Sequence, residues 1–182
     1  MQTLKVDENL ELRMVDEKYA PETFRVVREN LEHLGKWLPF ANENYTEQTA
    51  RDFFRTQLEK IRENGGAVYS IFWENELIGG IGFDNFDREA KTAEIGYWLA
   101  ADRQGKGIIT RSCRTVLKQA FGVFGLERIF IKCRAGNLKS RAIPERLGFF
   151  LEKEPAGGES EENNETLVVY SIRREDWEKT FG

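Results

Sequence analysis

Two glycines that flank a lysine mark the part of this chain best suited to chemistry. The loop reads Gln104-Gly105-Lys106-Gly107, and it joins a strand-like run that ends at Leu99 to an amphipathic stretch that starts near Ile109. Unpaired backbone N–H groups and the positive end of the helix dipole converge where a helix begins. Glycine also lets a ligand approach the backbone closely. This order therefore predicts a site for an anion such as a phosphate.

The sequence of the loop argues against two nucleotide-binding motifs. A Walker A loop needs a lysine after its second glycine and then Ser or Thr, whereas Lys106 lies between the glycines. A dinucleotide-binding turn needs a third glycine where Thr110 stands, and an acidic residue after the following strand, which ends Lys132-Cys133-Arg134-Ala135. The alternative without a ligand is a glycine pair that only eases a strand-to-helix turn.

The elements that position this loop follow from hydrophobic periodicity and turn residues. Pro21 suits the start of a helix, Thr46 a helix N-cap and Gly148 a helix end. A loop rich in Glu, Gly and Asn is expected from Glu152 to Glu165. The expected order is strand 10–15, helix 21–38, helix 46–64, strands 67–73, 77–83 and 92–99, helix 109–121, strand 128–133, helix 140–147 and strand 167–172. This order predicts a mixed α/β fold around one central sheet, with residues 1–182 as a single domain.

Composition narrows the function classes. The chain has 182 residues, of which 40% are apolar and 32% charged, as in soluble globular domains. The net charge of -4 lacks the basic excess of nucleic-acid-binding domains. No apolar run approaches the roughly 20 residues that span a bilayer, and the N-terminus lacks the order of a signal peptide. We expect a cytoplasmic protein that binds a small molecule or a cationic partner, and neither nucleic acid nor membrane.

Cysteine and histidine are too few and too far apart for a zinc site. Cys113 and Cys133 are the only cysteines and His33 is the only histidine. We therefore expect no metal and two reduced, buried thiols.

The loop resembles the signature of the GNAT acetyltransferase superfamily, [QR]-x-x-G-x-[GA], at a strand-to-helix turn. Gln104 and Gly107 match it, whereas Ile109 stands where the family has Gly or Ala. The run Ala93–Leu99 before the loop and the pattern Asn137-x-x-Ser140 with Leu147-Gly148-Phe149 after it look like the bacterial ribosomal-protein serine and alanine N-acetyltransferases. The resemblance extends over nearly the whole chain.

The resemblance implies a GNAT-type domain with a mostly antiparallel sheet and acetyl-CoA bound near residues 97–110. The backbone of three strand residues would contact the pantetheine arm and the acetyl carbonyl: Tyr97, Trp98 and Leu99. The loop and the first helical turn would hold the pyrophosphate: Gln104, Gly105, Lys106, Gly107, Ile108, Ile109 and Thr110. Asn137 matches a family asparagine near the cofactor.

The resemblance also implies the catalytic residues. Ser140 matches a serine near the CoA sulfur, a candidate general acid, and Pro144 stands where many relatives have a tyrosine. The structural alternative for Ser140 is a helix N-cap. Glu94 and Glu159 are the candidate bases that deprotonate the amine. Their alternatives are a solvent-facing strand residue and a solvated acidic loop.

The implied activity is N-acetylation of a primary amine, and the acceptor favoured by the resemblance is the α-amine of a protein such as a ribosomal protein. Acetylation of a polyamine or an antibiotic and a CoA-binding sensor without turnover are the alternatives. His33, Trp37 and Phe40 either lie on the acceptor side or have structural roles. The resemblance also allows a homodimer.

Overall fold

The computed structural model describes residues 3–153 and 166–181, and these form two compact units. The first unit comprises Met1–Gly82 and Tyr97–Thr115, and the second comprises Phe83–Gly96 and Val116–Gly182. Three elements begin in one unit and end in the other: β4 (Glu76–Asp87), β5 (Thr92–Leu99) and α4 (Ile108–Lys118). The strand order is β1-β2-β3-β4-β5-β6-β8-β7. The mixed α/β class is confirmed, and the single domain stays a prediction.

The strands of the first unit form an antiparallel meander: β1 (Thr3–Lys5), β2 (Leu10–Met14), β3 (Val68–Trp73) and the start of β4. Leu10 and Leu12 of β2 are fully buried and alternate with charged residues, as the period of a strand requires. Glu74 and Asn75 have φ values of 50° and 68°, and such left-handed turns match the twist of a hairpin. Strand β1 was not predicted, because three residues are too few for a periodic signal.

The helices of the first unit are α1 (Ala20–Glu29), α2 (Leu31–Gly35) and α3 (Glu47–Asn64). The prediction of one helix over 21–38 is wrong, because the helix is interrupted at Asn30 and α2 ends at Gly35. The Asn30 side chain donates from Nδ2 to the Val26 carbonyl at 2.8 Å, and its Oδ1 accepts the Ala101 N–H at 2.8 Å. An asparagine that bonds backbone groups in this way competes with the regular helix.

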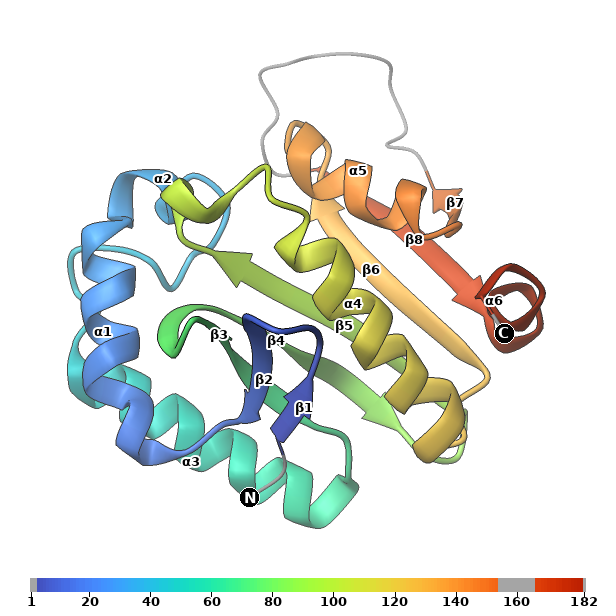
Figure 1. Cartoon of the computed structure of the whole chain (residues 1–182), viewed down its shortest axis with the longest axis horizontal. Helices are drawn as coiled ribbons and strands as arrows, with labels where there is room; N and C mark the ends of the chain where they lie inside the picture. The colour runs from blue at the N-terminus through green and yellow to red at the C-terminus, as the bar shows by residue number, and fades with distance from the viewer. Residues whose placement is uncertain (1–2, 154–165, 182) are drawn as a thin grey trace. The chain divides into compact units, whose positions relative to one another are not determined.

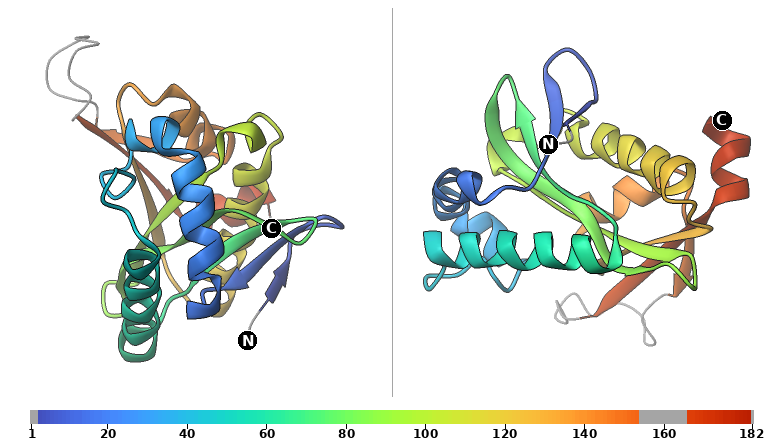
Figure 2. Two further views of the ribbon diagram at one scale, coloured as in Figure 1. Left: turned by 90° about the vertical axis from the view of Figure 1, so that its left-hand side faces the viewer. Right: turned by 90° about the horizontal axis from the view of Figure 1, so that it is seen from below.

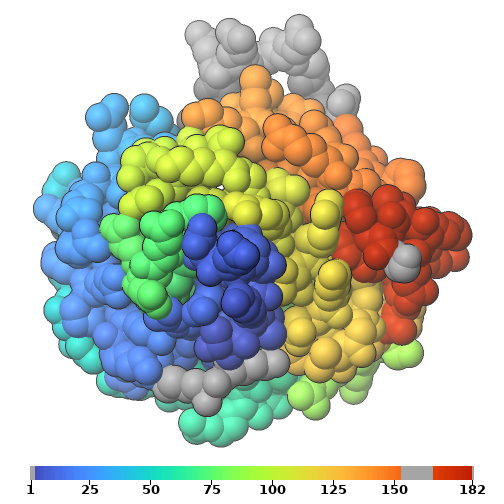
Figure 3. Space-filling view, viewed as in Figure 1, coloured from blue at the N-terminus to red at the C-terminus, as the bar shows by residue number. Residues whose placement is uncertain are grey.

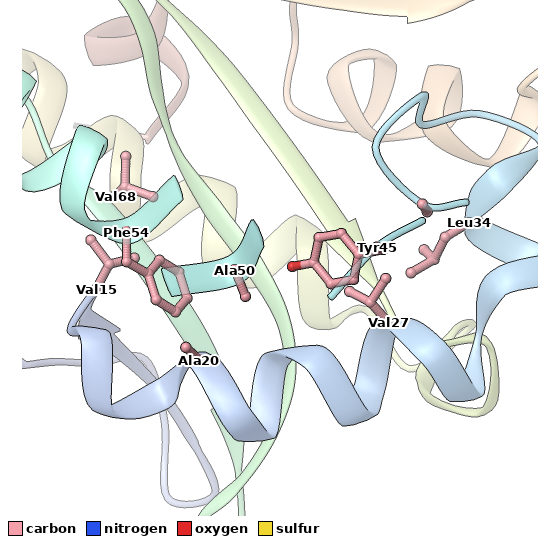
Figure 4. Packing of buried hydrophobic residues seen from close by; sticks show 9 residues of the cluster. Val15, Ala20, Val27, Leu34, Tyr45, Ala50, Phe54 and Val68 are labelled. Atoms are coloured by element: carbon pink, nitrogen blue, oxygen red, sulfur yellow. The ribbon is translucent and has the colours of Figure 1, made fainter. Parts of the chain in front are cut away.

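The hydrophobic core of the first unit lies between these helices and the sheet. Helices α1 and α3 pack side by side (Figure 1), and α3 lies on one side of the green strands in the right-hand view of Figure 2. Figure 4 shows Phe54 of α3 between Val15 and Ala20, with Val27 and Tyr45 farther along α1. This packing fixes the helices that precede the glycine loop in the chain.

Three strands lie wholly in the second unit: β6 (Arg128–Arg134), β7 (Phe150–Lys153) and β8 (Leu167–Arg173). Strand β6 pairs in parallel with β5 and antiparallel with β8, and β7 pairs antiparallel with β8. The predicted mostly antiparallel sheet is therefore confirmed.

The prediction that the late loop begins at Glu152 is wrong, because Glu152 belongs to β7. The Ser171 hydroxyl donates to Glu152 Oε1 at 2.6 Å and Arg128 forms an ion pair with the same carboxylate, and these bonds lower the pKa of Glu152. Residues 154–165 of the predicted loop lie outside the described residues.

The helices of the second unit are the end of α4, a π-helical turn at Gln119–Val123, α5 (Leu138–Arg146) and α6 (Arg174–Phe181). Gly148, at φ 77°, follows the end of α5 as predicted.

Cys113 and Cys133 are free and buried, which confirms the predicted thiols. No described group of three or more His, Cys, Asp or Glu could hold a metal ion. Within residues 3–153 and 166–181, no helix is long and apolar enough to cross a membrane.

The capping box of α3 yields a stability prediction. The Thr46 hydroxyl accepts the Thr49 N–H at 3.1 Å, and the Thr49 hydroxyl accepts the Thr46 N–H at 3.4 Å. Thr46→Ala removes the first bond, so we expect the free energy of unfolding in urea to fall by about 1 kcal/mol. Thr46→Ser keeps the hydroxyl and serves as the control. Equal stability of Thr46→Ala and the parent would contradict this role.

Candidate active site

The predicted anion loop has the backbone that a close ligand requires. After β5, a 3-10 turn at Ala101–Arg103 leads through the loop to α4. Gly105 and Gly107 have φ values of 74° and 69°, a region that glycine adopts without strain. Apart from the adjacent residues of the chain, no described heavy atom would lie within 4 Å of a Cβ added to either glycine. The backbone conformation therefore favours glycine, and the space beside it is open to a ligand.

The first turn of α4 fits a phosphate as well. Ile108 and Ile109 are only 2% and 8% exposed, so the isoleucine that departs from the family signature packs its side chain inside the protein. Lys106 is exposed within the loop and brings a positive charge. An eleven-residue helix, two open glycines and a lysine together form a suitable anion site.

The end of β5 is packed closely against a glycine pair in β4. A Cβ on Gly79 would lie 2.4 Å from the Trp98 carbonyl oxygen, and one on Gly80 would lie 2.5 Å from Trp98 Nε1. Leu99 is buried, whereas Tyr97 and Trp98 are half-buried. The glycines of β4 therefore fix the position of the segment expected to contact the pantetheine arm.

His33 contacts the first residue of the loop motif. Its Nε2 lies 2.8 Å from Nε2 of Gln104. The two residues are 71 positions apart, so sequence spacing alone gave no signal for the pair. His33 thus supports the loop from α2.

Glu94 lies in the second unit and is engaged by two neighbours. Its Oε2 is 2.7 Å from Lys132 Nζ and accepts a hydrogen bond from Asn85 Nδ2 at 3.3 Å. The Glu94 side chain is 19% exposed and is held by these two contacts, and its role as a base stays a prediction. An ionised carboxylate has about four lone-pair sites, so these contacts leave capacity to accept from water.

Asn137 and Ser140 lie together at the start of α5. Asn137 is the N-cap, and its Oδ1 accepts the Ser140 N–H at 3.1 Å. The alternative of Ser140 as N-cap is therefore wrong, because Asn137 holds that position. Burial raises the pKa of the Cys133 thiol, and a side-chain hydrogen bond with Ser140 opposes that shift. Cys133 was predicted only as a buried thiol, and sequence spacing gives no signal for its contact with Ser140.

A buried phenol ties α5 to β8. Tyr170 is 2% exposed; its hydroxyl accepts from Arg141 Nε at 3.1 Å and donates to Glu145 Oε1 at 2.8 Å. Burial raises the pKa of Tyr170, the bond with Arg141 lowers it, and the bond with Glu145 raises it. Sequence spacing gives no signal for this network, which holds the helix that carries Ser140.

Comparison with known proteins identifies the family. The model of the "Acetyltransferase (GNAT) domain" matches residues 9–150, which is more than half of the chain. The chain belongs to the GNAT acetyltransferase family.

Two similar proteins are named for ribosomal acetylation. A Putative ribosomal N-acetyltransferase YdaF of Bacillus subtilis (strain 168) is 35% identical over 180 residues, which cover 98% of each chain. A Ribosomal-protein-serine acetyltransferase of Escherichia coli (strain K12) is 33% identical and covers 83% of this chain and 84% of that protein.

A solved structure of RimL, a ribosomal L7/L12 alpha-N-protein acetyltransferase in complex with coenzyme A, has a TM-score of 0.86. It is 27% identical, and the match covers 94% of this chain and 98% of that chain.

The structure describes only some of the remaining predicted site residues of this GNAT chain. Glu159, the second candidate base, lies outside the described residues. Phe40 is 41% exposed and its ring centroid lies 5.8 Å from that of Tyr45, whereas Trp37 is half-buried. An acceptor role for these aromatic residues stays a prediction.

Gly79→Ala tests how closely β4 must approach Trp98. The new methyl group would displace backbone rather than a flexible side chain, so we expect a loss of stability of about 1–3 kcal/mol. We also expect a higher Kd for acetyl-CoA, measured by calorimetry on protein that is still folded. Gly122→Ala is the control, because its Cβ would have no described neighbour within 4 Å. Unchanged melting and binding in Gly79→Ala would refute the close approach.

Proposed function

We propose that this protein transfers the acetyl group of acetyl-CoA to a primary amine, the N-terminal α-amine of a protein such as a ribosomal protein. The observation that carries the proposal is the pair of left-handed glycines, open to a ligand, at the N-terminus of α4 in a chain of the GNAT family. The names of the similar proteins, which refer to ribosomal proteins, support the acceptor.

The first unit supplies the proposed cofactor contacts. Backbone N–H groups of the glycine loop and the first turn of α4 would bind the pyrophosphate, with Lys106 adding charge. The backbone of Tyr97–Leu99 would hold the pantetheine arm, and one N–H of that segment would donate to the acetyl carbonyl as its negative charge develops. Acetyl-CoA, when bound, supplies the activated thioester. No metal is needed for this chemistry.

Two side chains carry the proposed proton transfers. Glu94 would accept a proton from the incoming ammonium through water, because an amine attacks only in its neutral form. Unperturbed α-amines have a pKa near 8, so a modest base suffices at neutral pH. Ser140 would donate its hydroxyl proton to the leaving thiolate, and Asn137 fixes the backbone of that serine by capping α5. Glu159 stays the second candidate base.

The acceptor class rests on the relatives and on charge. The six glutamates from Glu152 to Glu165 bias that stretch toward a cationic partner, as a protonated protein terminus is. We place the protein in the cytoplasm, where ribosomal proteins are made and where free cysteines stay reduced. A polyamine or antibiotic acceptor is the alternative within the same chemistry.

Turnover measured as CoA thiol release tests the proton-transfer roles. We expect Ser140→Ala and Glu94→Gln each to lower kcat by about 10²-fold, the usual contribution of a positioned acid or base. The Kd for acetyl-CoA should stay within about twofold. Glu89→Gln, an exposed carboxylate in the turn between β4 and β5, is the charge-matched control. Parental turnover in both Ser140→Ala and Glu94→Gln would contradict the assignments.

The acceptor is tested with peptides that match ribosomal-protein N-termini, each with a free or a blocked α-amine. We expect thiol release only with the free amine, and mass spectrometry should place the acetyl group on the terminal nitrogen. Release with polyamines but with no peptide would favour the small-molecule alternative. Binding of acetyl-CoA without release for any amine would favour a sensor.

A further inference from the structure

Arg111 holds the carbonyl side of the glycine loop. It lies in the first turn of α4, where its Nη2 donates to the Lys106 carbonyl at 3.2 Å and its Nε to the Gly107 carbonyl at 3.5 Å. The Gly107 carbonyl also accepts the Arg111 backbone N–H at 3.0 Å. Both carbonyls of the loop's last two residues therefore face one guanidinium group.

The guanidinium group is itself fixed by the N-terminal hairpin. Asp7, in the connection between β1 and β2, forms an ion pair with Arg111 through Oδ2. Its other oxygen, Oδ1, accepts the N–H groups of Asn9 and Leu10 at 3.0 Å each. The Trp73 ring lies beneath the guanidinium, 5.5 Å from its carbon. In Figure 3 the dark-blue hairpin lies against the yellow start of α4. Arg111 thus has little freedom to turn away.

Peptide geometry links these contacts to the anion site. In a trans peptide the C=O and the N–H point in opposite directions. The chain has no cis peptide bond among its described residues. The peptide that carries the Lys106 carbonyl also carries the Gly107 N–H, and the peptide of the Gly107 carbonyl carries the Ile108 N–H. Because both carbonyls point toward Arg111, both N–H groups point away from it, toward the open side of the loop.

We propose that Arg111, held by Asp7, is a positioning residue that orients the Gly107 and Ile108 N–H groups toward the phosphates of acetyl-CoA. This inference rests on the proposed function, since it assigns how the same loop is preorganised. The positive charge of Arg111 is largely balanced by Asp7. The effect of Arg111 on binding therefore comes from geometry more than from attraction to the phosphates. The hairpin of β1 and β2 thereby supports the proposed cofactor site through Asp7.

The test compares Arg111→Ala, Asp7→Asn and the double variant, with Lys118→Ala as a control that removes a positive charge from the last residue of the same helix. Binding of acetyl-CoA is measured by calorimetry. We expect Arg111→Ala to raise the Kd about tenfold or more, since two hydrogen bonds from a charged donor are lost. Asp7→Asn should raise the Kd for acetyl-CoA about threefold. The double variant should have the same Kd as Arg111→Ala, because the two residues act as a unit.

A second substrate separates positioning from general damage. S-acetylpantetheine carries the thioester without phosphates, so kcat/KM for this substrate should be unchanged in Arg111→Ala while kcat/KM for acetyl-CoA falls. Equal losses for both substrates would overturn the proposal. Tighter binding in Asp7→Asn would also overturn it, because it would mark a freed Arg111 as a direct phosphate ligand.

Two further outcomes separate the inference from the function on which it rests. Parental affinity in Arg111→Ala, with a parent that binds acetyl-CoA, overturns the inference alone. A parent that does not bind acetyl-CoA overturns the proposed function and the inference together. Melting curves are recorded for every variant, and Asp7→Asn, which keeps an acceptor for Asn9 and Leu10, carries the test if Arg111→Ala does not fold.

Discussion

The site depends first on the direction of the backbone N–H groups where α4 begins. A phosphate binds there only if several N–H groups converge, and convergence requires backbone angles that most residues avoid. Gly105 and Gly107 supply those angles, at φ values of 74° and 69°. The buried Ile108 and Ile109 anchor the first turn of α4 behind the loop. The polar contacts around the loop make sense as supports for this one backbone conformation.

Those supports come from elements distant in the sequence. Asn30 accepts the Ala101 N–H, His33 contacts the Gln104 side chain, and Asp7 fixes the arginine that faces the loop carbonyls. The interruption between α1 and α2 therefore contributes to the site, because one continuous helix would not leave the Asn30 side chain where it accepts the Ala101 N–H. A loop held from several sides is preorganised, and little entropy is then lost when a ligand binds.

Periodicity predicted the elements whose signal is local and long. The strand 92–99 matches β5 residue for residue, and Thr46 caps α3 as its sequence indicates. The errors fall where a tertiary contact decides. Asn30 breaks a helix because Ala101 is near, and Glu152 joins a strand because Ser171 and Arg128 bond it. Of the candidate site, the motif predicted the loop and Ser140, but no spacing could indicate Arg111, Asp7 or Cys133 as neighbours of those residues.

Calorimetric titration of acetyl-CoA into the parent and into Gly107→Glu tests the phosphate-binding loop most directly. The glutamate would strain the backbone at φ 69° and place a negative charge in the open space beside the loop. The proposed site predicts saturable binding by the parent and none by Gly107→Glu at the same ligand concentrations, with the variant still folded by its melting curve. Equal affinity of the two proteins would show that acetyl-CoA binds elsewhere or that this loop does not hold its phosphates.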